Sequence, residues 1–160
     1  MKTTEEIYKI LAQVNDPEVP VLSILDLGIV RDVNIISEKE IEIFITPTYS
    51  GCPAMSMIST QIKMELFSNG YSDVKVIEVL SPAWTTDWMS NEGKEKLNKY
   101  GIAPPQYQVK NNPTESEAVV PCPICDSKDT VLLSQFGSTA CKALYKCNAC
   151  LEPFDYFKCH

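Results

Sequence analysis

The chain has 160 residues, of which 44% are hydrophobic, and its 21 acidic and 14 basic residues give a net charge of −7. This acidic balance argues against nucleic acid or an anionic membrane as the main partner, and no apolar run approaches the roughly 20 residues of a membrane span. The first residues, MKTTEEIYKI, are acidic where a signal peptide has its apolar stretch, so we expect a cytoplasmic protein whose cysteines are reduced or bind metal.

The first two thirds of the chain predict a small α+β domain with the order α-β-β-α-β-α. Thr3 and Glu6 form a capping box that starts the first helix, and the prolines of residues 16–20 break it. Isoleucine occupies every second position of residues 41–45, as expected of a strand with one buried side. The remaining elements are expected at residues 29–36 (strand), 53–69 (helix), 74–80 (strand) and 87–100 (helix).

The composition changes after this domain, which suggests a second module. Residues 104–120 are rich in proline, asparagine and acidic residues and lack apolar periodicity, as a linker does. We therefore divide the chain into a domain at 1–103, a linker at 104–120 and a C-terminal ribbon at 121–160. The strands of the ribbon are expected at residues 130–136, 143–145 and 154–158.

Two Cys-x-x-Cys pairs define the ribbon. Cys122 and Cys125 form the first pair, and Cys147 and Cys150 follow after twenty-one intervening residues. A two-residue gap lets one tight turn point both sulfurs at one ion, so the four thiolates predict a closed, structural zinc site. Two disulfides or a redox-active pair are the alternatives.

Cys52 is the candidate functional thiol of the first domain. It lies between a loop with three hydroxyl residues, Thr46, Thr48 and Ser50, and the expected second helix. A helix N-terminus stabilises a thiolate, and a lowered pKa would make Cys52 a nucleophile or a metal ligand. The alternative is a buried cysteine that packs as a small apolar residue.

Three carboxylates, those of Asp16, Glu18 and Asp26, lie near prolines and Gly28. Carboxylates in rigid loops can bind metal ions or act as acids and bases. Because aspartate commonly bonds to nearby backbone amides, we favour capping for Asp16 and Asp26.

For five further residues, the sequence gives weaker indications of a role. Trp84 and Trp88 are expected to pack in the core or at its edge rather than form a binding surface. Cys141 is either a partner contact or a spectator in a turn, Cys159 adjoins the terminus, and His160 is the terminus itself.

Three segments of the first domain resemble a known family. DPEVP (16–20), SILDLGIV (23–30) and the Thr-Pro…Gly-Cys-Pro segment (46–53) are similar to the domain of SufT-like bacterial proteins and of eukaryotic cytosolic iron–sulfur assembly targeting factors. This resemblance covers roughly residues 3–103. Three sequence segments of the ribbon, CPICDS, FGSTACKALYKC and CNACLEPFDYFK, extend the resemblance. With them, nearly the whole chain resembles the PaaD (PaaJ) family, the accessory component of the bacterial phenylacetyl-CoA epoxidase.

The resemblance implies an accessory or maturation factor in phenylacetate degradation, and not an enzyme. It would assist assembly of the iron–sulfur reductase or the diiron oxygenase, with Cys52 facing Asp16 and Glu18 and carrying iron or an iron–sulfur cluster transiently. The loop that holds Cys52 is longer than in the SufT-like relatives, which weakens that analogy. The alternative is a non-catalytic structural or regulatory subunit of the epoxidase complex.

The expected partners follow from the same resemblance. They are the oxygenase or reductase subunits of the epoxidase, the iron–sulfur assembly machinery, and a second copy of the chain in a homodimer. A thiol-redox enzyme fits less well, because the paired cysteines suit a closed metal site. A nucleic-acid-binding ribbon also fits poorly, because the ribbon lacks a cluster of basic residues.

Overall fold

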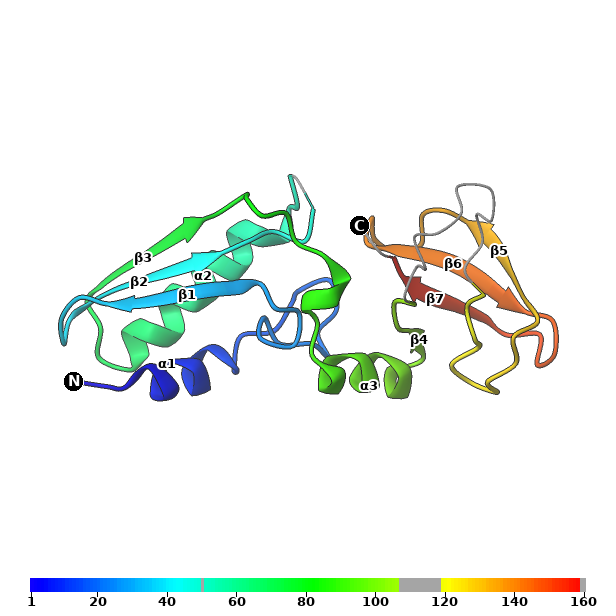
Figure 1. Ribbon diagram of the computed structural model, residues 1–160, viewed down its shortest axis with the longest axis horizontal. Helices are drawn as coiled ribbons and strands as arrows, with labels where there is room; N and C mark the ends of the chain where they lie inside the picture. The colour runs from blue at the N-terminus through cyan, green and yellow to red at the C-terminus, as the bar shows by residue number, and fades with distance from the viewer. Residues whose placement is uncertain (50, 107–118, 159–160) are drawn as a thin grey trace. The chain divides into compact units, whose positions relative to one another are not determined.

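The structure is a computed structural model that describes residues 1–49, 51–106 and 119–158. The described chain divides into two compact units, residues 1–93 and residues 94–158 (Figure 1). Within these residues, no helix combines the length and the apolar character needed to cross a membrane. The expected domain boundaries at 103 and 120 stay a prediction, and most of the expected linker, residues 107–118, lies outside the described residues.

The predicted order of elements in the first part of the chain is confirmed. The elements are α1 (Thr4–Leu11), β1 (Val30–Ile35), β2 (Glu40–Ile45), α2 (Ala54–Ser68), β3 (Asp73–Glu78), the short 3-10 helix η1 (Thr86–Trp88) and α3 (Asn91–Tyr100). The capping box of Thr3 and Glu6 starts α1 as expected. The helix expected over 87–100 is instead two helices, because Met89 is extended and Ser90 accepts a hydrogen bond from the Gly93 N–H, which starts α3 afresh.

The first unit is built on a three-stranded sheet with the order β1-β2-β3. β2 is antiparallel to β1 and parallel to β3, because α2 connects β2 to β3 and returns the chain to the same edge. Every second residue of β2 is buried, and so are residues on one side of α2. The apolar residues of these two elements in this core are Ile41, Ile43, Ile45, Ala54, Met55, Ile58, Ile62 and Leu66.

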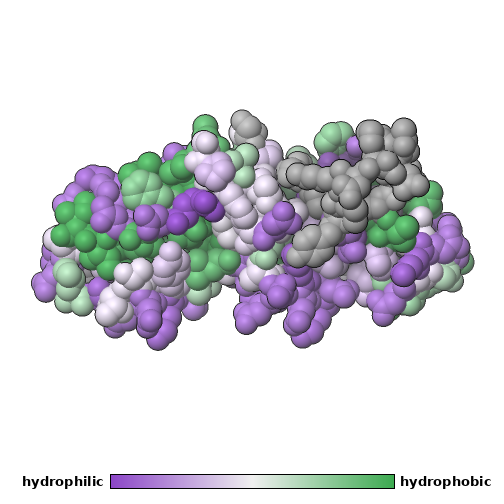
Figure 2. All heavy atoms as spheres, viewed as in Figure 1, coloured by the Kyte–Doolittle hydropathy of each residue, from purple (hydrophilic) through white to green (hydrophobic). Residues whose placement is uncertain are grey.

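Some apolar side chains of this unit remain exposed. Figure 2 shows hydrophobic residues gathered on the visible surface of this unit, where Figure 1 draws β1–β3 and α2. On α2 itself, three large apolar residues outside the core are exposed, Met57, Met64 and Phe67. The helix is therefore apolar on more than the side that packs in the core.

The loop between β2 and α2 is tied to the sheet at its first residue. The Thr46 N–H donates to the Ile29 carbonyl at 2.9 Å, and the Thr46 hydroxyl donates to the Val79 carbonyl at 2.7 Å. Thr46 is 1% exposed. The two bonds join segments from three parts of the chain, and so they fix where the loop that carries Cys52 begins.

The second unit contains a four-stranded sheet with the order β4-β7-β6-β5. Its strands are β4 (Ile102–Ala103), β5 (Thr130–Ser134), β6 (Lys142–Cys147) and β7 (Pro153–Phe157). The three ribbon strands expected from the sequence are confirmed to within a few residues. β4 was not expected, and its two residues pair in parallel with Asp155 and Tyr156 of β7.

Candidate functional site

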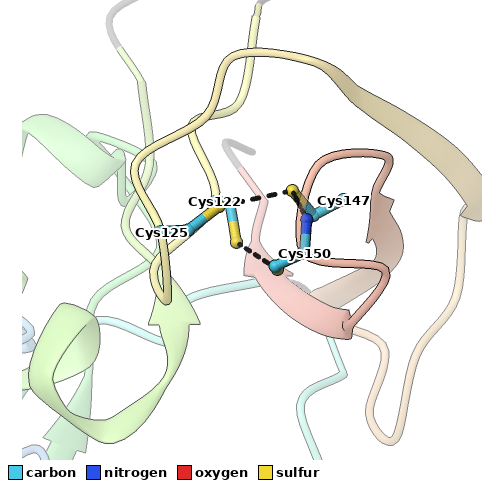
Figure 3. A group of neighbouring side chains, drawn as sticks. All are labelled: Cys122, Cys125, Cys147 and Cys150. Atoms are coloured by element: carbon cyan, nitrogen blue, oxygen red, sulfur yellow. Dashed lines mark hydrogen bonds between the residues drawn. The ribbon is translucent and has the colours of Figure 1, made fainter.

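The four paired cysteines come together at one end of the ribbon (Figure 3). Their sulfur atoms all lie within 4.8 Å of one another. The Sγ atoms of Cys122 and Cys150 are 3.8 Å apart, and those of Cys125 and Cys147 are 3.6 Å apart. A disulfide bond is about 2.05 Å long, so the four residues are free thiols in this arrangement.

These distances fit one tetrahedral metal ion. Four sulfurs at about 2.3 Å from a zinc ion lie about 3.8 Å from one another along the edges of the tetrahedron. The cluster can therefore hold a metal ion with all four positions filled by protein. A zinc ion in this set would crosslink the two knuckles and would have no open position for a substrate. That the ion is zinc stays a prediction.

Backbone N–H groups point at the sulfurs, as they do around metal-bound thiolates. The Ile124 N–H donates to Cys122 Sγ at 3.4 Å, and the Cys150 N–H donates to Cys147 Sγ at 3.5 Å. The second bond is the main cause that lowers the pKa of Cys147 to about 6. An N–H bond from Glu152 lowers the pKa of Cys150, but burial and the neighbouring cysteines together raise it to about 12.

Four thiolates whose sulfurs lie within 4.8 Å of one another would repel, so full ionisation of the cluster needs a compensating positive charge. A divalent cation held by Cys122, Cys125, Cys147 and Cys150 would supply that charge, and the thiols would lose their protons when it bound.

Cys52 lies just before α2, with 9% of its surface exposed. Its N–H donates to the Tyr49 carbonyl at 3.2 Å, and its own carbonyl accepts from the Met55 N–H at 3.3 Å. Three donors near the sulfur, the Ala54 N–H and the hydroxyls of Tyr49 and Thr48, each act to lower the pKa of the thiol. Ser50, the other hydroxyl residue of interest here, lies outside the described residues.

The expected lowering of the Cys52 pKa is wrong. Burial raises the pKa of Cys52, and the nearby Glu18 carboxylate raises it further. The three donors to the sulfur act in the opposite direction, but they do not overcome the cost of placing a charge in a buried site. Cys52 is therefore a thiol at neutral pH, and it becomes a thiolate only when a cation or a base compensates the charge.

Of the two carboxylates that the resemblance placed opposite Cys52, Glu18 lies near enough to act on the pKa of its thiol. Asp16 is buried, and its Oδ1 atom accepts hydrogen bonds from the N–H groups of Glu18 at 2.7 Å and Val19 at 2.9 Å. Asp16 thus holds the turn that presents Glu18, in agreement with the capping interpretation. Direct roles for Cys52, Asp16 and Glu18 in function stay predictions.

Asp26 and the two tryptophans have structural contacts. Asp26 Oδ2 accepts from the Ser23 N–H at 2.9 Å, which confirms capping. Trp84 is buried and donates its indole N–H to the Leu27 carbonyl at 2.7 Å. The Arg31 guanidinium lies over the Trp88 ring, 3.8 Å from its centre. Trp84 therefore packs in the core, whereas Trp88 is half-buried.

The remaining cysteines are outside the cluster or outside the described residues. Cys141 is 3% exposed, and its sulfur lies 2.9 Å from the Thr139 hydroxyl oxygen. Cys159 and His160 lie outside the described residues.

Tyr49 is the site residue that the sequence analysis missed. Its signal was its position three residues before Cys52, within one turn of the loop.

Two families match successive parts of the chain. Residues 4–79 match the iron–sulfur cluster assembly protein family, and residues 106–158 match the PaaD zinc beta ribbon domain. A solved domain of unknown function (DUF59) from Bacillus anthracis is 32% identical, with a TM-score of 0.55, and the match covers 58% of this chain and 89% of that one.

Two curated relatives extend the comparison. An Escherichia coli K12 protein, provisionally named as a subunit of 1,2-phenylacetyl-CoA epoxidase, is 51% identical over 96% of this chain and 92% of its own length. An Fe–S protein maturation auxiliary factor of Porphyromonas gingivalis is 33% identical over 61% of this chain and 92% of its own length. The similarity to the Escherichia coli protein over nearly the whole chain agrees with the match of residues 106–158 to the PaaD zinc ribbon domain. The chain therefore belongs to the PaaD family, with an iron–sulfur assembly domain followed by the PaaD zinc ribbon domain.

Proposed function

We propose that this protein is an accessory maturation factor of a phenylacetyl-CoA epoxidase. In this proposal it assists assembly of the iron–sulfur reductase or the diiron oxygenase of that system, and Cys52 handles the iron or the cluster. The observation that carries the proposal is the buried Cys52 thiol beside the Glu18 carboxylate, in a domain that matches the iron–sulfur assembly family. The names of the relatives, an epoxidase subunit and an Fe–S maturation factor, support the same role.

The environment of Cys52 suits binding that is coupled to proton loss. The thiolate is the metal ligand, so the thiol must lose its proton when iron arrives. The positive charge of iron offsets the burial and the repulsion from Glu18 that raise the pKa of Cys52. Glu18 then changes from a repulsive neighbour into a carboxylate ligand of opposite charge to the cargo.

One thiol and one carboxylate form an incomplete ligand set. Iron–sulfur clusters are held by four protein ligands, usually cysteines. The missing ligands would come from the client protein or from the assembly machinery, which favours release of the cargo over storage. The ribbon acts in this proposal as a docking module whose four cysteines hold structural zinc.

The test is the zinc, iron and sulfide content of anaerobically purified protein after iron reconstitution. Wild type, Cys52→Ser and Cys141→Ser are compared. Cys141→Ser is the matched control, because Cys141 is also buried and beside a hydroxyl group. We expect one zinc per chain in all three, with iron or sulfide retained by wild type and Cys141→Ser but not by Cys52→Ser. Equal iron in all three, or none in any, would remove Cys52 as the carrier.

A second candidate is a structural or regulatory subunit of the epoxidase. The raised pKa and the burial of Cys52 favour it, because an inert packed thiol has the same two properties. This candidate predicts stoichiometric retention of the chain in the purified oxygenase and unchanged epoxidase activity with Cys52→Ser. Loss of activity with Cys52→Ser, restored by in vitro iron loading of the client, supports the maturation factor instead.

A further inference from the structure

A cavity of about 320 Å³ lies between the segment that follows α1 and the middle of α2. It is lined by Gln13, Val14, Asn15, Gln61, Met64 and Glu65. This volume is at the small end of the range for ligand pockets, about 300–1,000 Å³, so it suits one long side chain rather than a cofactor.

Two acceptors in this cavity lack a donor within the described chain. Gln61 Oε1 is buried and has no hydrogen-bond partner there. The Glu65 carboxylate is paired with no cation of the described residues. A buried acceptor without a partner costs free energy, so such a group calls for a ligand that donates. Gln61 Oε1 therefore favours a ligand that donates a hydrogen bond, and the half-buried Glu65 carboxylate, unpaired among the described residues, favours one that carries positive charge.

Apolar surface surrounds the acceptors. Val14 and Met64 form apolar walls of the cavity, and Met64 continues into an exposed strip on α2 with Met57 and Phe67. These three residues are exposed by 53% (Met57), 61% (Met64) and 48% (Phe67), and residues three, four and seven apart share one side of a helix. An occupant must thus combine a cationic end with an aliphatic stem and apolar neighbours.

We propose that this surface docks a partner protein by taking one of its arginine side chains into the cavity. The aliphatic stem would pack on Val14 and Met64, and the planar guanidinium has enough donors to serve Gln61 Oε1 and the Glu65 carboxylate together. Apolar residues beside that arginine cover the strip of Met57 and Phe67. Charge favours such a basic partner, since this chain carries a net charge of −7.

The occupant is not supplied by this chain or by a second copy. The sequence contains a single arginine, Arg31, and its guanidinium already lies over the Trp88 ring.

The surface also has a defined place relative to the functional thiol. Gln61 is seven residues after the start of α2, about 10 Å along the helix axis, and Cys52 precedes that start. A partner docked here would contact the helix that follows Cys52, but the docking does not depend on iron binding there.

The test is a titration of the full chain with acetyl-Leu-Arg-Leu-amide, followed by ¹H–¹⁵N NMR. Matched peptides carry citrulline, which keeps the shape without the charge, or lysine in place of arginine. We expect saturable shifts at residues 13–15 and 61–65 with the arginine peptide, and much weaker ones with the other two. No saturable shift up to millimolar peptide, or equal binding of the citrulline peptide, would overturn the proposal. Equal binding of the lysine peptide would overturn the choice of arginine.

Variants separate binding from folding. Glu65→Gln should weaken the arginine peptide about tenfold or more, the size expected from a lost charged hydrogen bond. Glu78→Gln is the control, because it makes the same charge change at an exposed position on β3. Gln61→Leu should also weaken the peptide while leaving the free protein as stable or more stable, because it removes the unpaired acceptor. Equal peptide affinity for Glu65→Gln and Glu78→Gln contradicts the assignment, and so does a Gln61→Leu variant that loses stability without losing affinity.

Discussion

Replacement of Gly28 by alanine tests the close approach between two segments of the first unit. Gly28 has φ +71°, and a Cβ built on it lies 2.9 Å from both the carbonyl carbon and the Cβ of Trp88, and closer still to the carbonyl oxygen. These are mostly backbone atoms of η1, which cannot turn aside as a flexible side chain can. The segment 81–90 must therefore move as a whole, or the chain at Gly28 must change conformation.

The expected loss combines two effects. A non-glycine residue in the left-handed region costs about 1–2 kcal/mol, and forcing extra atoms into a packed site costs about 1–3 kcal/mol. We therefore expect Gly28→Ala to lower the free energy of unfolding by about 2–5 kcal/mol. The matched control is Gly70→Ala. Gly70 has φ +100° with no atom within 4 Å of the added Cβ, so only the conformational cost applies.

The measurement is urea unfolding followed by tryptophan fluorescence. Trp84 and Trp88 both lie in the first unit, so the signal reports on the unit that is perturbed. Equal m-values would show that the variants differ in stability and not in the extent of unfolding. If Gly28→Ala and Gly70→Ala lose the same free energy, the close approach to Trp88 contributes nothing and the steric reasoning fails.

Three further predictions concern the cysteines. Cys147→Ser, or a strong chelator added to wild type, should unfold the ribbon, because two of the metal-binding residues belong to its small core. Cys141→Ser should leave the ribbon folded, and NMR signals of the ribbon distinguish the two outcomes. A ribbon that stays folded without metal would contradict a structural ion. For Cys52, alkylation followed by mass spectrometry should be slow at pH 7 and should still rise above about pH 8.5, because burial raises the pKa of this thiol. The stability that comes from keeping Cys52 protonated is fully present below the unfolded pKa, about 8.5, and is lost as the pH rises through the folded pKa. Wild type should therefore lose stability relative to Cys52→Ser above about pH 8.5, and parallel pH profiles of the two proteins would refute the shift.

The sequence by itself determined the features that depend on neighbouring residues. The capping box of Thr3 and Glu6 acts within one helical turn, and the alternation of residues 41–45 marks a strand with one buried side. The two Cys-x-x-Cys pairs likewise specify two knuckles, because each pair needs only a tight turn between its cysteines. These local rules were enough for the order of elements, the strands of the ribbon and the cluster of four cysteines.

The tertiary structure alone decided the features that join distant segments. The pKa of Cys52 depends on burial and on Glu18, which precedes it by thirty-four residues. The sequence prediction relied on the helix N-terminus, which is only one of several opposing effects on this pKa. The pairing of β4 with β7 depends on an edge formed by residues 153–157, and two residues carry too little pattern to predict it. The cavity at Gln61 and Glu65 exists only because the segment that follows α1 lies beside α2, since neither segment alone encloses a side chain.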